Sequence, residues 1–190
     1  TNMYASLSQA MEMLFLLPFA IGRHSSAAMT HMAFLFLLPW LILCYGRRTG
    51  FTNAGAMAAV LIFCSPVIGI DGISAYNDVA TTAAIFTVFY LLQLWKADKQ
   101  DGLLLAIGLV AGFAFALKYT AFLALPYALG VIIKELHRDK KPWIIPVLRV
   151  GAIASVLILP WMIKNILIVG NPVSPFLNSI FPNHFIHIWF

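Results

Sequence analysis

Long apolar runs separated by short polar breaks constrain this chain more than any other feature of its sequence. The run over residues 25–45 can cross a bilayer, which takes about 20 apolar residues. Hydrophobic residues make up 62% of the 190 residues and charged residues only 10%, whereas about a quarter of a soluble domain is charged. A chain this short cannot bury such an excess in its own core. Lipid must therefore cover it.

We predict one all-α transmembrane domain over residues 1–190, a polytopic helical bundle integral to the cell inner membrane or an equivalent membrane. The expected elements are an interfacial helix at 9–22, spans at 25–45, 51–69, 78–95 and 143–169, two short packed helices at 102–117 and 119–134, and an outer-side tail at 170–190. Gly108 and Gly112 lie in the first helix of the short pair, where small residues allow close helix packing.

The charged residues divide unevenly between the two predicted sides of the membrane. One side carries Arg47, Arg48, Lys96, Lys99, Lys134, Arg138, Lys140 and Lys141, with Arg149 nearby. The other side carries only Arg23, Lys118 and Lys164. The first side is therefore predicted to be cytoplasmic. Because the net charge of +5 comes from these loops, it is not an indication of nucleic-acid binding.

The isolated polar residues of the predicted outer side are the main pointer to a site. They are Glu12, Arg23, His24, Asp71, Asp78, Lys118, Lys164, Asn165, Asn171, His184 and His187. The stretch over residues 66–80 carries Asp71 and Asp78, and a carboxylate at a membrane boundary is costly unless it is solvated, paired or used. Two alternatives remain open: Asp78 also fits a helix cap, and Asp71, followed by Gly72, also fits a turn.

The histidines and cysteines give weaker signals. His24 and His31 are seven residues apart and share a helical face, so ligation of a metal or pigment by this pair stays open. His184 and His187 are expected to be solvated residues of the membrane interface. Cys44 and Cys64 have no spacing typical of a metal site. We predict no metal site and no firm cofactor.

Several motifs together resemble membrane glycosyltransferases of the GT-C class, and most closely the branch that uses polyprenyl-phosphate-linked sugars, which includes protein mannosyltransferases and aminoarabinose transferases. The motifs are YGRR at residues 45–48, the aspartate just before the span at 78–95, GFAFALKYT at 112–120, and PWMIKN at 160–165 followed by GNPVSPF at 170–176. The last pattern is the most specific.

The resemblance implies an enzyme that moves a sugar from a polyprenyl-phosphate carrier to an acceptor outside the cytoplasm. Such chemistry needs a carboxylate for the acceptor hydroxyl and cations for the departing phosphate. We expect Asp78 and Asp71 as catalytic carboxylates. The expected ligands of the phosphate and the rest of the substrate are Lys118, Arg23, Lys164, Asn165 and Asn171. Arg23 and Lys164 also fit interfacial anchors.

The family's first span and first acidic loop are expected upstream of Thr1. Glu12 lies too far along the chain to replace the catalytic acid of that loop. The alternative function is a non-catalytic transmembrane subunit of a larger membrane complex, with the lipid bilayer and other subunits as its partners.

Overall fold

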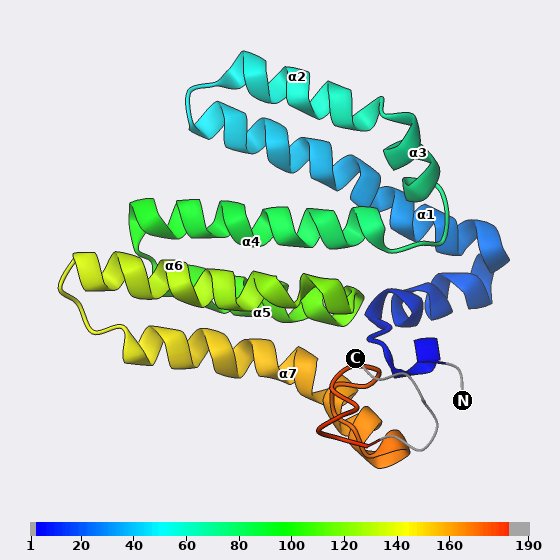
Figure 1. The fold of residues 1–190 in the computed structure, drawn as a ribbon. Helices are drawn as coiled ribbons and strands as arrows, with labels where there is room; N and C mark the ends of the chain where they lie inside the picture. Colours follow the sequence, from blue (N-terminus) through cyan, green and yellow to red (C-terminus); the bar gives the residue numbers. More distant parts are fainter. Residues whose placement is uncertain (1–2, 183–190) are drawn as a thin grey trace.

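A computed structural model describes residues 3–182 as helices and turns, with no strand in that range (Figure 1). The elements are the 3-10 helices η1 (Met3–Ser6) and η2 (Tyr119–Leu123) and the helices α1 (Ala10–Arg48), α2 (Thr52–Phe63), α3 (Pro66–Gly72), α4 (Asp78–Asp98), α5 (Asp101–Leu117), α6 (Ala124–Arg138) and α7 (Ile144–Val169). The prediction of an all-α polytopic bundle is confirmed. The side chain of His24, and His184 and His187, lie outside the described residues.

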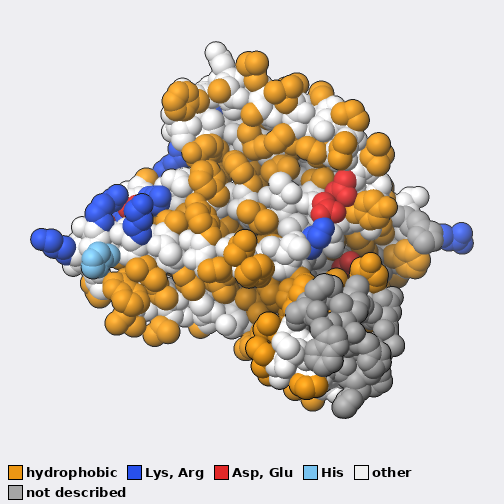
Figure 2. Space-filling view, in the orientation of Figure 1, with side chains coloured by type: hydrophobic (Ala, Val, Ile, Leu, Met, Phe, Trp, Pro, Cys, Tyr) orange, Lys and Arg blue, Asp and Glu red, His pale blue; other side chains and the backbone are white. Residues whose placement is uncertain are grey.

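Four segments in the described part of the chain are long and apolar enough to cross a membrane: Ser25–Arg48, Asp78–Asp98, Tyr119–Arg138 and Ile144–Val169. Their outward side chains are largely apolar, as Figure 2 shows on one face of the molecule. In α7, for example, Val156 is 67% exposed and Leu167 is 79% exposed. Such a surface is stable against lipid rather than water.

The long helix α1 is broken at Arg23, where φ is 61° and ψ is −149°. A non-glycine residue rarely adopts a positive φ, so the break is a true change of direction. It falls between the helices predicted over 9–22 and 25–45. In Figure 1 the first part of α1 turns back across the ends of the other helices, whereas the second part runs beside α2.

The single span predicted over 51–69 corresponds to two helices, α2 and α3, which are long and apolar enough together to cross a membrane but are separated by a bend of 65°. Pro66 is the first residue of α3, and Ser65 before it is extended, with a ψ of 120°. A proline lacks the N–H needed inside a helix and disfavours helical geometry in the preceding residue. As a result, Asp71 lies in a short helix and only residues 73–77 link it to α4.

The core forms where α4, α5, α6 and α7 meet. Ile107 on α5 and Ile132 on α6 are fully buried there, as is Val150 on α7. The small residues of α5 allow the close approach that their pattern predicts: a Cβ added at Gly112 would lie 2.6 Å from the carbonyl oxygen of Ala154. This packing fixes the end of α5, and therefore the residue that follows it, relative to the bundle.

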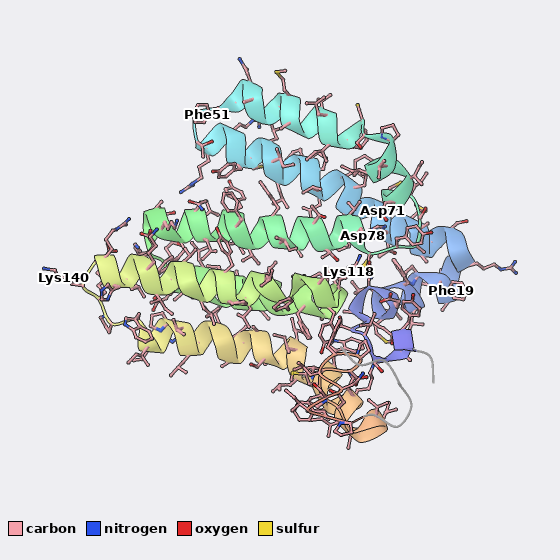
Figure 3. The ribbon with its side chains drawn as sticks, in the orientation of Figure 1. Phe19, Phe51, Asp71, Asp78, Lys118 and Lys140 are labelled. Atoms are coloured by element: carbon pink, nitrogen blue, oxygen red, sulfur yellow. The ribbon has the colours of Figure 1, made fainter. Side chains whose placement is uncertain are left out.

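The molecule has two chemically different ends. Phe51 and Lys140 mark one end in Figure 3, and Asp71, Asp78 and Lys118 lie toward the other. We call them the basic end and the Asp78 end. At the basic end several charges are paired, for example Arg48 with Asp98 at 3.3 Å and Lys99 with Asp139 at 3.1 Å.

Candidate functional site

An ion pair between Lys118 and Asp78 lies at the Asp78 end of the bundle (Figure 3). Asp78 is the first residue of α4, and Lys118 directly follows α5 in an extended conformation. The two side chains are 61% and 36% exposed, respectively. The sequence places them 40 residues apart, and the antiparallel course of α4 and α5 brings them together.

The start of α4 is held by side chains from two other helices. The backbone N–H groups of the first turn of a helix have no partner within the helix. In α4, Val79 donates its N–H to the Oδ2 atom of Asp71 at 3.0 Å, and Ala80 donates to the Nε2 atom of His31 at 3.3 Å. Asp78 is therefore not the residue whose carboxylate satisfies these donors, and its own carboxylate faces Lys118.

His31 is fully buried and joins α1, α3 and α4. Its Nδ1 atom lies 3.0 Å from the carbonyl oxygen of Asp71 and 2.9 Å from that of Ser74. Because both oxygens only accept hydrogen bonds, Nδ1 carries the proton and Nε2 is the acceptor from Ala80. Both ring nitrogens are thus used, which leaves neither for a metal. No group of three or more potential metal ligands occurs among the described residues.

A further contact ties the start of α4 to the end of α5. The side-chain amide of Asn77 donates to the carbonyl oxygen of Leu117 at 3.3 Å. Asn77 and Leu117 each immediately precede one member of the ion pair. The relative position of Asp78 and Lys118 is therefore set by the backbone as well as by their own attraction.

Two hollows meet at the ion pair. The first, which we call the apolar hollow, has a volume of about 240 Å³ and is lined by Leu38, Val67, Ile68 and Val79, with Asp71 and Asp78 among its few polar residues. The second, which we call the polar hollow because more of its lining residues are polar, has a volume of about 350 Å³. Its polar residues include Ser8, Gln9, Glu12, Asn77, Lys118 and Thr120, and apolar and aromatic side chains complete its walls. One member of the ion pair lines each hollow, so the pair stands between them.

Lys164 and Asn165 bind the N-terminal segment rather than a hollow. Lys164 donates to the carbonyl oxygen of Ala5 at 2.7 Å, and the side-chain amide of Asn165 donates to that of Ser6, also at 2.7 Å. Ser8 then donates its hydroxyl to the carbonyl oxygen of Phe115 at 2.7 Å. The N-terminal segment is thereby fixed against α7 and α5, beside the polar hollow.

Asn171 and Arg23 also lie away from the two hollows. Asn171 is fully buried and orders the turn that follows α7: its side chain donates to the carbonyl oxygen of Phe176 at 2.9 Å and accepts from the N–H of Val173 at 2.9 Å. Arg23 is exposed at the bend of α1 and makes no ion pair within the part of the chain that the structure describes. Of the seven predicted site residues, Asp71, Asp78 and Lys118 line the hollows.

Glu12 and His31 are the residues that the sequence-based site omitted. Glu12 lines the polar hollow together with Lys118. The only signal in the sequence was its position as an isolated charge on the same side as the predicted site. Nothing in the sequence indicated that His31 contacts α4, because its partners are backbone groups.

The comparisons with known proteins give one match, to a family model. No curated protein and no solved structure matches the chain. The family model described as dolichyl-phosphate-mannose-protein mannosyltransferase matches residues 11–163, which is more than half of the 190 residues and includes both members of the ion pair. The match confirms the resemblance to GT-C glycosyltransferases, and the chain belongs to the dolichyl-phosphate-mannose-protein mannosyltransferase family of membrane glycosyltransferases.

Proposed function

We propose that the Asp78 end binds a polyprenyl-phosphate-linked sugar and takes part in the transfer of that sugar to an acceptor on the extracytoplasmic side. The observation that carries this proposal is the Lys118–Asp78 pair between an apolar and a polar hollow. A lipid-linked sugar has the same division into an apolar chain, a charged phosphate and a polar ring. The family match supports the reaction class.

Lys118 is the group that we assign to the phosphate. In sugar transfer, negative charge builds on the phosphate oxygen as its bond to the anomeric carbon breaks, and a fixed cation stabilises that charge. In the absence of substrate, the ammonium group of Lys118 is paired with Asp78. Asp78 thus holds the cation in place, and its carboxylate becomes available to a hydroxyl group when Lys118 turns to the phosphate.

Each hollow suits a different part of the donor. The apolar hollow adjoins exposed apolar side chains of α3, including Val67 at 78% and Ile70 at 64% exposure. These surfaces suit the first part of a polyprenyl chain that enters from the membrane. The polar hollow suits the sugar, because it combines hydrogen-bonding groups with the rings of Tyr4, Tyr119 and Phe176. Binding pockets are usually built from such a mixture of apolar walls and a few polar groups.

Asp71 supports the site from α3, and a direct catalytic role for it stays a prediction. The same applies to the substrate contacts predicted for Arg23, Lys164, Asn165 and Asn171. In this proposal, Lys164 and Asn165 act by holding the N-terminal segment beside the polar hollow.

The substitution Lys118→Ala in the full-length protein tests the assignment. Loss of one such donor costs about 10²–10³ in rate, so we expect turnover of a polyprenyl-phosphate sugar to fall by that factor and donor binding to fall less. Lys140→Ala at the basic end is the matched control, and it should leave transfer unchanged. If Lys118→Ala transfers sugar at the normal rate, the proposal is wrong. If the Lys118→Ala variant leaves a larger membrane assembly intact and functional, the alternative of a non-catalytic subunit is favoured.

Labelling of single cysteines tests the membrane orientation. Basic loops face the cytoplasm, so Lys140→Cys should react with an impermeant reagent only from that side. Tyr76→Cys, in the loop before α4, should react only from the other side; Tyr76 is 62% exposed. Cys44 and Cys64 are replaced by serine in both variants. Reaction of both introduced cysteines from the same side would contradict the proposed orientation.

A further inference from the structure

Another hollow lies at the basic end, beside the loop that joins α6 to α7. Its volume is about 600 Å³, which is larger than that of either hollow at the Asp78 end. Figure 2 shows Lys and Arg side chains gathered at this end, which Figure 3 marks with Lys140. We call it the basic hollow, because the described residues that line it include no carboxylate but do include His137, Arg138, Lys140 and Lys141, together with Trp143 and Ile144.

The turn that follows α6 holds the two lysines of this hollow in place. Lys140 donates its N–H to the carbonyl oxygen of His137 at 3.1 Å, and Lys141 donates its N–H to that of Leu136 at 2.9 Å. Two such bonds around one left-handed residue are a common way to end a helix. The left-handed residue is Lys140, with a φ of 52°. Both ammonium groups are therefore carried on a closed turn.

The two carboxylates of this helix end are already paired with other cations. Glu135 is buried, and it lies 3.7 Å from Lys99 and 3.9 Å from Lys96. Asp139 lies 3.1 Å from the ammonium group of Lys99. Arg138 pairs with both acids. These contacts tie the end of α6 to the end of α4, and they leave no carboxylate of the turn for the two lysines.

Lys140 and Lys141 thus remain as cations without an acidic partner. Both are exposed, and neither makes an ion pair with a described residue. Lys99 gives the contrast, because it ends α4 with the same φ of 52° but pairs with Asp139. Lys99 lowers the pKa of the Asp139 carboxyl, and the charges of Arg138 and Lys141 lower it further. The potential at the turn is therefore positive, which favours an anionic ligand.

The basic hollow adjoins an apolar stripe of α7. The stripe consists of Ile144, Leu148, Ala152 and Val156, which are all exposed and share one helical face because they are four residues apart. It is about 18 Å long at a rise of 1.5 Å per residue. Trp143, at the N-cap of α7, lies at the head of the stripe, and tryptophan is typical of the boundary between lipid and water. A phospholipid can use both the hollow and the stripe, whereas a soluble phosphate can use only the hollow.

We propose that the basic hollow binds the phosphate headgroup of an anionic phospholipid in the leaflet at the basic end. Lys140 and Lys141 lie against the phosphate, Trp143 lies at the level of the glycerol backbone, and an acyl chain follows the stripe of α7. Basic pockets between membrane helices bind anionic headgroups in this way. The site is at the opposite end of the bundle from Lys118 and Asp78 (Figure 3), so the phospholipid takes no part in the transfer of sugar.

Native mass spectrometry of the full-length protein in a neutral detergent tests the proposal. The probes are palmitoyl-oleoyl phosphatidylglycerol, which is anionic, and phosphatidylcholine with the same acyl chains, which has no net charge. Each basic residue near an anionic membrane surface contributes about fivefold to the affinity. With two lysines, we expect one phosphatidylglycerol molecule to bind with a Kd about 25-fold lower than that of phosphatidylcholine.

The double variant Lys140→Gln with Lys141→Gln should lose this preference. Its Kd for phosphatidylglycerol should rise about 25-fold, while its Kd for phosphatidylcholine stays the same. Lys140→Arg with Lys141→Arg keeps both charges and should keep the preference. The matched control is Arg47→Gln with Arg48→Gln, which removes two charges from the end of α1, outside the lining of the basic hollow. It should bind both lipids as the unmodified protein does.

Four results would overturn the proposal. Equal Kd values of the unmodified protein for the two lipids would mean that it has no headgroup site. An equal loss in the control variant would make the preference an effect of net charge at the basic end. Displacement of phosphatidylglycerol by an equimolar amount of inorganic phosphate or glycerol phosphate would identify a soluble phosphate as the ligand. Loss of phosphatidylglycerol binding in Lys118→Ala would place the lipid at the Asp78 end instead.

Discussion

The carboxylate of Asp71 accepts a hydrogen bond from the backbone N–H of Val79 at 3.0 Å, across the loop that joins α3 to α4. The next N–H of α4, that of Ala80, binds His31. Capping of α4 is therefore provided by α3 and α1. This arrangement explains how Asp78, the first residue of the same helix, can pair with Lys118 at the edge of two hollows.

Replacement of Asp71 distinguishes a capping role from a catalytic one. Asp71→Ala removes the acceptor for the N–H of Val79, and loss of such a cap costs about 1 kcal/mol in the free energy of unfolding. Asp71→Asn keeps a side-chain oxygen, so we expect a thermal midpoint close to that of the unmodified protein and nearly normal transfer. A loss of transfer in a fully stable Asp71→Asn variant would instead assign Asp71 to the reaction.

Replacement of His31 should lower the rate of transfer by more than the accompanying loss of stability explains. His31→Ala removes the partner of the buried N–H of Ala80 and of the part-buried carbonyl oxygen of Ser74, whereas the carbonyl oxygen of Asp71 keeps the N–H of Ser74. A buried group left unsatisfied costs about 1–3 kcal/mol. The substitution also releases the start of α4, so Asp78 and Lys118 lose their fixed geometry. Ile107→Val is the control, because it removes one methyl group from the core far from the site and costs about 0.5–1.5 kcal/mol.

The readout is the rate of transfer at a temperature where both variants are folded. We expect His31→Ala to be the slower enzyme at equal folded fraction, with a lower kcat and a KM for the donor that changes less. Equal rates per folded molecule would show that His31 serves stability alone.

The contact of α5 with α7 gives a prediction about stability alone. Gly112→Ala would bring a Cβ atom within 2.6 Å of the carbonyl oxygen of Ala154. Backbone atoms must then move apart, and overpacking of this kind costs about 1–3 kcal/mol. The matched control is Gly130→Ala in α6, since nothing lies within 4 Å of its added Cβ. Alanine favours a helix over glycine by about 1 kcal/mol, so this control should be neutral or stabilising in a thermal unfolding assay.

The features that sequence predicted correctly are those set by hydrophobicity and chain direction. Apolar runs of sufficient length become helices because their backbone groups have no partner in lipid. Successive spans alternate in direction, so the start of α4 and the end of α5 meet at one end. Asp78 and Lys118 were predicted together for this reason.

The features that sequence did not predict depend on contacts with the backbone. His31 binds carbonyl oxygens at the end of α3 and an N–H of α4, and Lys164 binds carbonyl oxygens of the N-terminal segment. Backbone groups occur at every residue, so no sequence pattern marks the ones that become partners. The break before Pro66 is different, because a proline interrupts a helix and is visible in the sequence, yet the span predicted over 51–69 ran through it.

Exchange of the two charges of the central pair separates a structural role from a chemical one. The double variant with Asp78→Lys and Lys118→Asp keeps an opposite pair at the same place. Its stability should return to within about 1 kcal/mol of the unmodified protein, the remainder being the cost of a cation at a helix N-terminus. Transfer should stay about 10²–10³ below normal, because the cation no longer sits at the edge of the polar hollow where we place the phosphate.

The same exchange at the basic end is the control for this experiment. Arg48 and Asp98 form an exposed pair at 3.3 Å, and such pairs are worth about 0.2–1 kcal/mol. Their exchange should leave both stability and transfer close to normal. If the exchanged Asp78–Lys118 pair also transfers sugar normally, the pair serves the fold and the phosphate lies elsewhere. If stability fails to recover while transfer is lost, the two side chains do not contact each other as the structure shows. The thermal midpoint and kcat are measured on the same preparations. Only a phosphate-binding role of Lys118 predicts that the thermal midpoint recovers while kcat stays low.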